Sequence, residues 1–268
     1  MDFDKKAVHN FWQSAACGEN LYLLEKTQKE FLKQAEVRYQ LEPYIENFAN
    51  FNSSTSKKVL EIGVGLGADH QRFAQAGAIL SGIDLTNRAI EITTRRLQIL
   101  NLESSLQVGD AENLPFENSF FDIVYSWGCL HHTPDTKKAI NEIFRVLKPG
   151  GISKVMIYNK YSIVGYMLWM RYALFKFKPN LSLESIYNKY LESPGTKAYS
   201  IDEAKQLFSK FKDVDIKIVL THADFLTSQV GQQHRGLILS LAKLLLPRWL
   251  IRKFMPNHGL FMLITATK

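Results

Sequence analysis

Two carboxylates and three glycines form the most informative group of residues in this chain. Glu61 precedes Gly63, Gly65 and Gly67, and Asp84 ends the next apolar segment, about 20 residues after the first glycine. Glycines that follow a strand let the backbone turn sharply and approach a ligand, because a Cβ there would collide with it. A carboxylate only accepts hydrogen bonds, so Asp84 suits the two hydroxyls of a ribose. The pattern predicts a site for a nucleoside-containing cofactor. Alone, it also fits NAD, FAD, another nucleotide or a simple tight turn.

Further motifs follow the glycines in a fixed order. They are Gly109-Asp110-Ala111-Glu112, the apolar run from Phe121 to Gly128, Leu130-His131-His132, and the turn Leu147-Lys148-Pro149-Gly150-Gly151. In order and spacing, residues 57–159 resemble the class I S-adenosylmethionine (SAM) dependent methyltransferases. They are most similar to the methyltransferase type 11 kind found in quinone, sterol and natural-product pathways. A dinucleotide-binding domain of a dehydrogenase, the main alternative, has no role for the Asp-Ala-Glu and Lys-Pro-Gly-Gly elements.

The resemblance implies SAM as the cofactor and a set of residues that bind it. Glu61 and the glycine loop would face the methionine end of SAM, and Asp84 would bind its ribose. Asp110 and the amide of Ala111 would read the adenine, while Ser126 and Trp127 would lie along the sulfonium. The residues implied to bind SAM are Glu61, Gly63, Gly65, Gly67, Asp84, Leu85, Asp110, Ala111, Glu112, Ser126 and Trp127.

Two candidate proton acceptors follow the fourth predicted strand. Methyl transfer from a sulfonium has a neutral leaving group, so the protein must mainly position the acceptor and remove its proton. His131 and His132 fit this task because imidazole titrates near neutral pH, and we rank His132 first. The alternative is structural: one histidine packs in the core and the other caps the turn at 133–135.

Residues outside the core motifs are expected to bind the methyl acceptor. Residues 1–56 are predicted to form a helical lid, and residues 160–199 and a second insertion near 226–258 are predicted to form a cap. The candidate acceptor-binding residues are Trp12, Glu19, Tyr158, Lys160, Tyr166, Trp169 and Tyr199. Aromatic side chains suit an apolar acceptor body. The alternatives are that Trp12 covers the core and that residues 158–161 cap the sheet edge.

Alternating strand and helix patterns must position these residues. Predicted strands at 58–62, 79–84, 105–109, 121–127 and 152–158 alternate with helices at 68–76, 86–100 and 135–147. A helix at 201–211, opened by the capping box Ser200–Glu203, precedes strands at 214–221 and 259–267. A longer helical pattern covers 21–47, with Pro43 interrupting it. The predicted fold class is α/β, a Rossmann-like seven-stranded methyltransferase sheet with helical cap insertions. The resemblance implies that its last strand is antiparallel. Residues 200–268 would return to the core sheet begun by 57–159.

Charge is unevenly distributed along the chain. Residues 1–151 carry 16 Lys and Arg against 19 Asp and Glu, whereas residues 152–268 carry 17 against 7. The basic second half fits an anionic group on the acceptor, an anionic surface, or solubility alone. Segments 162–178 and 237–254 each join an apolar body to basic residues. That pattern fits weak association with a membrane surface or, as we favour, a cap helix packed on the sheet.

Composition disfavours several classes of protein. The N-terminus lacks a secretory signal, and no segment reaches the roughly 18 apolar residues of a transmembrane helix. Cys17 and Cys129 lie in unrelated contexts, which predicts free thiols and a cytoplasmic location. The sequence has no metal-binding motif, so no metal is expected.

The sequence therefore predicts a SAM-dependent methyltransferase acting on a small-molecule, lipid-linked or sugar-linked acceptor, with O-methylation ahead of C- or N-methylation. No stable nucleic-acid partner is expected. One alternative is an RNA or protein methyltransferase that docks through the basic half of the chain. A non-catalytic SAM-binding protein is the other.

Overall fold

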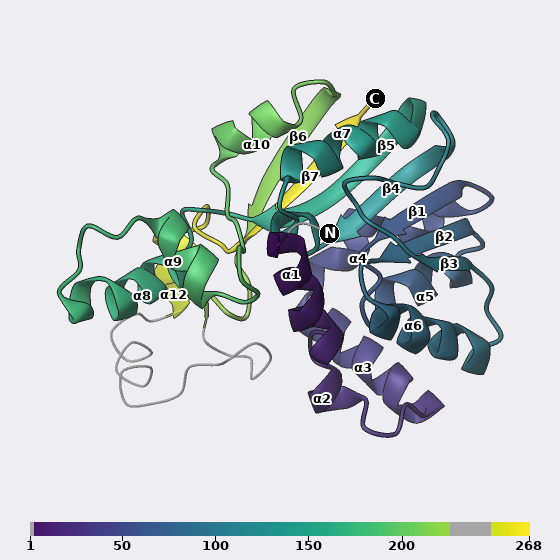
Figure 1. Cartoon of the computed structure of the whole chain (residues 1–268), viewed down its shortest axis with the longest axis horizontal. Helices are drawn as coiled ribbons and strands as arrows, with labels where there is room; N and C mark the ends of the chain where they lie inside the picture. Colours follow the sequence, from purple (N-terminus) through teal and green to yellow (C-terminus); the bar gives the residue numbers. More distant parts are fainter. Residues whose placement is uncertain (1–2, 226–247) are drawn as a thin grey trace.

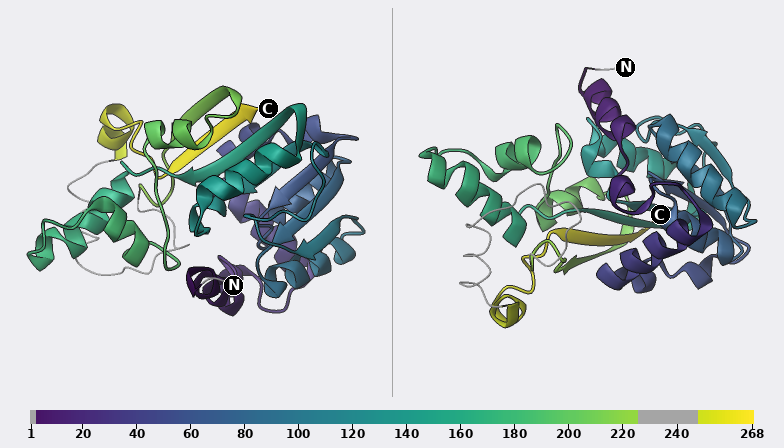
Figure 2. Two further views of the ribbon diagram at one scale, coloured as in Figure 1. Left: turned by 45° about the horizontal axis from the view of Figure 1, so that its top comes forward. Right: turned by 90° about the horizontal axis from the view of Figure 1, so that it is seen from below.

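A seven-stranded sheet forms the centre of the molecule (Figures 1 and 2). The computed structural model describes residues 3–225 and 248–268. The strand order is β3-β2-β1-β4-β5-β7-β6. The strands are β1 (Lys58–Ile62), β2 (Ile79–Asp84), β3 (Ser105–Val108), β4 (Phe121–Trp127), β5 (Leu147–Tyr158), β6 (Lys212–Val219) and β7 (Phe261–Thr267). Strands β1 to β5 pair in parallel, and β7 runs antiparallel to both β5 and β6. The predicted fold class is confirmed.

Helices cover both faces of this sheet because alternate strand residues point to opposite sides. Leu60, Ile62 and Val124 pack in the core beneath α7 (Thr136–Val146) and α10 (Ile201–Leu207). Val59, Ile123 and Tyr125 pack on the other face, with residues of α4 (Tyr44–Ala49) and α5 (Ala68–Gln75). Helix α6 (Asn87–Ile99) connects β2 to β3. The predicted capping box opens α10, which ends at Leu207 and is therefore four residues shorter than predicted.

The order of the strands determines where a ligand binds. From β1 the chain adds β2 and β3 on one side, and then returns to place β4 on the other side. In such sheets the crevice beyond the carboxyl ends of the strands at this reversal is the usual ligand site. The residues that follow β1 and β4 therefore lie together at the carboxyl ends of these strands, next to the 3-10 helix η2 (Leu130–His132).

The N-terminal segment forms four α-helices, where the sequence pattern predicted a helical stretch over 21–47 interrupted at Pro43. They are α1 (Phe3–Ser14), α2 (Glu19–Tyr22), α3 (Gln28–Leu41) and α4, followed by the 3-10 helix η1 (Phe51–Ser54). The sequence pattern missed the break before α3, where Thr27 and Glu30 form a capping box that starts this helix. Pro43 then precedes α4. Figure 1 shows α1 at the end of the sheet that faces the cap helices.

The cap helices form a separate group beyond the end of β5 (Figures 1 and 2). They are α8 (Ile163–Tyr172), the 3-10 helix η3 (Leu174–Lys176) and α9 (Leu183–Tyr190). Helix α12 (Arg248–Phe254) lies apart from them, as Figure 2 shows. Helix α8 packs against α9, where the rings of Tyr172 and Tyr190 stack at 3.9 Å. Within the segment 162–178, α8 packs against α9, whereas Phe175 and Phe177 are exposed. Most of the second predicted insertion and the start of the segment 237–254 lie outside the described residues. Within 3–225 and 248–268, none of the helices has the length and apolar character needed to cross a bilayer.

Candidate active site

A cavity of about 450 Å³ opens at the carboxyl ends of β1, β4 and β5. Its volume is in the range of small-molecule binding sites. The predicted residues that line it are Trp12, Glu61, Gly63, Gly65, Gly67, Trp127 and Tyr158. Residues that the sequence analysis did not single out line it as well, among them Cys17, Arg38, Glu42, Asp69, Met167, Met170, Arg171 and Glu192.

The loop after β1 presents bare backbone to this cavity. Gly63, Gly65 and Gly67 all have positive φ angles, of 81°, 53° and 75°. A Cβ on Gly63 would lie 2.5 Å from the Cβ of Cys129, and one on Gly67 would lie 2.8 Å from the side chain of Thr93. At Gly65 a Cβ would meet no atom within 4 Å, so this part of the backbone borders open space. The loop therefore needs glycine for its own conformation and leaves room for a ligand.

Burial favours a neutral acid at Glu61 and a neutral imidazole at His70, and their hydrogen bonds fit this pair. Ser104 donates its hydroxyl proton to the carbonyl of Leu80 (3.0 Å), so it accepts from Nε2 of His70 (2.8 Å). Nδ1 of His70 is then unprotonated and accepts a proton from the Glu61 carboxyl at 2.8 Å. Burial and the nearby Asp69 raise the pKa of Glu61, and burial lowers the pKa of His70 to about 3, in agreement with this assignment.

Asp84 lies beside the glycine loop and stabilises it. One carboxylate oxygen accepts from the amide of Gly65 at 3.2 Å, and the other accepts from the amide and hydroxyl of Thr86 at 3.0 and 2.9 Å. Burial raises the pKa of Asp84. Asp84 and Leu85 are half-buried next to the loop and are not part of the cavity wall.

Helix α1 covers the residues implied to read adenine. Nζ of Lys5 lies 2.7 Å from Asp110 and 2.7 Å from Glu112. Burial alone would lower the pKa of Lys5, but the two carboxylates raise it above its ordinary value. Ala111 is buried between them, and Glu112 also accepts from the amide of Asp135 at 2.8 Å. Lys5 thus neutralises this acidic edge of the site.

Two lid residues were predicted to touch the acceptor, and the structure separates them. Trp12 reaches the cavity and packs edge-on against His132, with ring centroids 5.3 Å apart. Glu19 is buried elsewhere and pairs with Arg88 at 2.6 Å and Lys26 at 3.2 Å. Although burial opposes ionisation, the hydrogen bond from Arg88 helps to lower the pKa of Glu19. Glu19 therefore connects α2 to α6.

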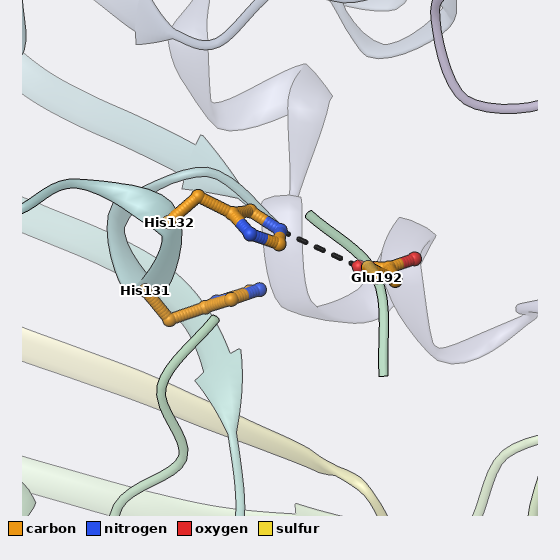
Figure 3. Close-up of side chains that lie close together, drawn as sticks. All are labelled: His131, His132 and Glu192. Carbon is orange, nitrogen blue, oxygen red and sulfur yellow. Dashed lines mark ion pairs between the residues drawn. The ribbon is translucent and has the colours of Figure 1, made fainter. Parts of the chain in front are cut away.

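A polar group of His132, Glu192 and Tyr158 lies beside the cavity, and Glu192 and Tyr158 line it. Figure 3 shows His132 next to Glu192. Nε2 of His132 lies 3.4 Å from Oε2 of Glu192. The same oxygen accepts a hydrogen bond from the Tyr158 hydroxyl at 2.7 Å. Nδ1 of His132 lies 2.8 Å from Oγ of Ser193 and 3.1 Å from Oγ1 of Thr196. Burial raises the pKa of Tyr158, so this phenol remains a donor to Glu192.

His131 lies beneath His132 and is fully buried. Its ring packs in a tilted arrangement against Tyr158 and His132, with ring centroids 3.9 and 4.2 Å apart. Neither ring nitrogen has a hydrogen-bond partner among the described residues. Burial, followed by the nearby His132 and Lys197, lowers the pKa of His131 well below its ordinary value, so this imidazole is neutral.

A charged network that the sequence analysis missed supports the opposite wall. Asp69 accepts two hydrogen bonds from the Arg38 guanidinium, at 3.0 and 2.7 Å, and one each from the hydroxyls of Tyr39 (2.9 Å) and Tyr125 (2.8 Å). Burial opposes ionisation of Asp69, but Arg38 outweighs it and lowers the pKa. Arg38 also pairs with Glu42 at 3.2 Å, and burial raises the pKa of Glu42 to about 7.

The other predicted site residues lie away from the cavity. Lys160 pairs with Glu203, Tyr166 bonds His258 at 2.9 Å, and Trp169 donates to the carbonyl of Leu181 at 2.8 Å. Tyr199 packs against the main core, and Ser126 donates to the carbonyl of Ile62 at 3.0 Å. In this structure Lys160, Tyr166 and Trp169 therefore support the cap and its connections, and Tyr199 and Ser126 support the sheet.

Comparison with known proteins agrees with this geometry. Residues 60–154 match the family described as the methyltransferase domain. The chain is 34% identical over 118 residues to phosphoethanolamine N-methyltransferase 2 of Caenorhabditis elegans, covering 43% of this chain and 26% of that protein. It is 33% identical over 169 residues to the ubiquinone biosynthesis O-methyltransferase of Haemophilus ducreyi, covering 61% of this chain and 65% of that protein. The chain thus spans less than two thirds of the length of either relative.

A solved structure shows the same fold. It is a SAM-dependent methyltransferase of Thermotoga maritima, described as a possible histamine N-methyltransferase. Its TM-score to this chain is 0.51 at 20% identity, and the match covers 92% of this chain and all of that one. The strand order, the glycine loop and the match of residues 60–154 together identify a methyltransferase domain in this chain, with the fold of that solved structure.

Proposed function

We propose that this protein transfers a methyl group from SAM to a hydroxyl group of a small, largely apolar acceptor. The observation that carries the proposal is one cavity that joins the glycine loop after β1 to an apolar wall and to the Glu192–Tyr158 pair beside His132.

The residues at the glycine loop suit SAM, which supplies an electrophilic methyl group on a sulfonium. The bare backbone at Gly65 leaves space for the methionine end. The Glu61 carboxyl lines the cavity and can ionise beside a cation. Asp84, fixed by Gly65 and Thr86, keeps lone pairs for ribose hydroxyls.

The acceptor side of the cavity is mainly apolar. Its lining includes Met156, Val164, Met167, Leu168, Met170, Leu191 and Phe261. Glu42 and Glu192 also line this cavity, and Arg38 is already paired with Asp69 and Glu42. Arg171 also lines the cavity, where its guanidinium lies over the ring of Tyr172. With Arg38 paired in this way, the two carboxylates favour a neutral acceptor over an anionic one, despite the basic composition of residues 152–268.

His132 is the residue we propose to take the acceptor's proton. Thr196 donates its hydroxyl proton to the carbonyl of Ser193 at 2.7 Å, so it can only accept from Nδ1 of His132. In the tautomer that we propose, Nδ1 donates to Thr196 and Ser193, and a lone pair remains on Nε2. Once Nε2 gains a proton, the imidazolium lies 3.4 Å from the Glu192 carboxylate, which stabilises the charge formed during the reaction.

The test is a screen with isotopically labelled SAM. The purified protein is incubated with small-molecule, lipid and RNA fractions, and transfer of label to a small molecule or lipid is expected. His132→Ala should lower kcat by about 10²- to 10⁴-fold, the usual contribution of a general base, without changing the Kd for SAM. His9→Ala, on the outer lid helix, is the matched control. Label found only in RNA or protein fractions would contradict the proposal, as would a folded protein that fails to bind SAM.

A further inference from the structure

His131, His132 and Glu192 bring three potential metal ligands together beside the cavity. Their ligand atoms all lie within 4.8 Å of one another. Figure 3 shows the nitrogen-bearing edges of both imidazole rings directed to the side on which Glu192 lies. The histidines belong to η2 and the glutamate to the turn after α9, about 60 residues later in the chain. No local spacing motif could reveal such a set, which explains why the sequence predicts no metal site.

The unsatisfied state of His131 is a second, independent observation. The side chain is fully buried, yet both of its ring nitrogens lack a partner in the described part of the chain. Leaving a buried polar group without a hydrogen bond is unfavourable. Its ring is held by packing between Tyr158 and His132 instead. An ion at this position would satisfy a nitrogen that the protein leaves unpaired.

We infer that His131, His132 and Glu192 form a binding site for a divalent transition metal ion of the Zn²⁺ type. The 3.4 Å between Nε2 of His132 and Glu192 matches the edge of a tetrahedron with ligand distances of about 2.1 Å. Two imidazoles and one carboxylate are a common ligand set for Zn²⁺, and they leave a fourth position open.

The surroundings of the ligands support this assignment. Nδ1 of His132 is oriented by Ser193 and Thr196, and Glu192 is oriented by the Tyr158 hydroxyl. Hydrogen bonds of this kind fix metal ligands in known sites. The Glu192 side chain is 24% exposed and lines the cavity, so it provides both the adaptable ligand and the route of entry.

An ion at this site would take the lone pair of His132 that we propose as the proton acceptor. On that proposed function, metal binding and proton removal exclude one another, and the loaded protein should lose turnover. The binding inference itself stands on the ligand geometry alone.

The experiment is a titration of metal-free, full-length protein with Co²⁺, followed by visible absorption, and with Zn²⁺, followed by calorimetry. One ion per chain and the d–d bands of four- or five-coordinate Co²⁺ are expected. His131→Phe should weaken binding by more than the roughly 10- to 100-fold that loss of a ligand's hydrogen-bonding partner costs. Glu192→Gln serves as a second variant and His9→Ala as the control, with SAM binding and circular dichroism confirming that each variant is folded.

The inference is overturned if the folded wild-type protein gives neither bands nor heat, or if both ligand variants bind as tightly as wild type. A sulfur-to-cobalt charge-transfer band would also overturn it, because Cys17 lines the same cavity. Tight binding with increased turnover would support the metal site and contradict the role of His132 as a base, which separates failure of the two proposals.

Discussion

Replacing Glu61 by glutamine should separate its role in the fold from its role in cofactor binding. In the structure the neutral Glu61 carboxyl donates to Nδ1 of His70, which donates in turn to Ser104. A glutamine amide can donate to the same nitrogen from nearly the same position. The free energy of unfolding should therefore change by less than about 1 kcal/mol. Glu61→Ala leaves His70 without that donor and should cost about 1–3 kcal/mol.

Glu61→Gln should weaken SAM binding strongly, although it changes stability little. A cationic ammonium placed beside Glu61 would favour the ionised carboxylate and form a charge-assisted hydrogen bond, which contributes roughly 1.5–3 kcal/mol. Glutamine cannot ionise, so the Kd for SAM should rise about 10- to 150-fold. Ionisation of Glu61 on binding should also release up to one proton near pH 7, because burial raises the pKa of Glu61 well above its ordinary value in the free protein.

Isothermal titration calorimetry in buffers of different ionisation enthalpy measures both quantities. The wild-type protein should show an apparent enthalpy that varies with the buffer, and Glu61→Gln should show much less variation along with its weaker binding. Equal affinity of the two proteins, or no proton release by the wild type, would refute the proposed protonation of Glu61 and its position beside the ammonium.

Three further predictions follow from the same contacts. Asp84→Asn should weaken SAM binding by about 10-fold or more through loss of charge-assisted hydrogen bonds, measured by calorimetry, and a change below twofold would contradict the ribose contact. Trp169→Ala should cost about 2–3 kcal/mol of stability in urea unfolding and impair turnover while SAM binding survives, since the indole packs in the cap and bonds Leu181; an equal loss of SAM binding would show that the core depends on this residue. Lys154 donates to the carbonyl of Ala49 at 2.7 Å, and burial lowers its pKa to about 8. Between pH 8 and 10.5 the unfolded chain therefore binds more protons, and wild type should gain up to about 3 kcal/mol over Lys154→Met as pH rises; a difference independent of pH would contradict this.

The sequence could predict the central sheet because its signals are local. The strand from Lys58 to Ile62 and the glycines after it agree with the structure residue by residue. The capping box at Ser200 correctly placed the start of α10. The same signal was present at Thr27 and Glu30, and reading it would have divided the helical stretch predicted over 21–47.

The cavity wall was harder to predict because distant segments build it. Glu192 reaches His132 from a turn after α9, and Lys5 reaches Asp110 across about 100 residues, without any regular spacing to reveal either pair. Trp169 and Tyr166 were chosen for their aromatic character, but such residues also build the interior of a cap, and here their polar atoms bond within the protein. Composition alone cannot separate these two uses of an aromatic side chain.

The two ion pairs of Lys5 should affect how tightly the cofactor binds. If Asp110 reads adenine as the resemblance implies, the closed arrangement in which Lys5 bonds Asp110 and Glu112 competes with the bound ligand for the same oxygens. The apparent dissociation constant then equals the intrinsic constant divided by the fraction of molecules whose lid is open. Affinity for the cofactor is therefore set partly by a helix at the start of the chain, at a distance of about 100 residues from the carboxylates it covers.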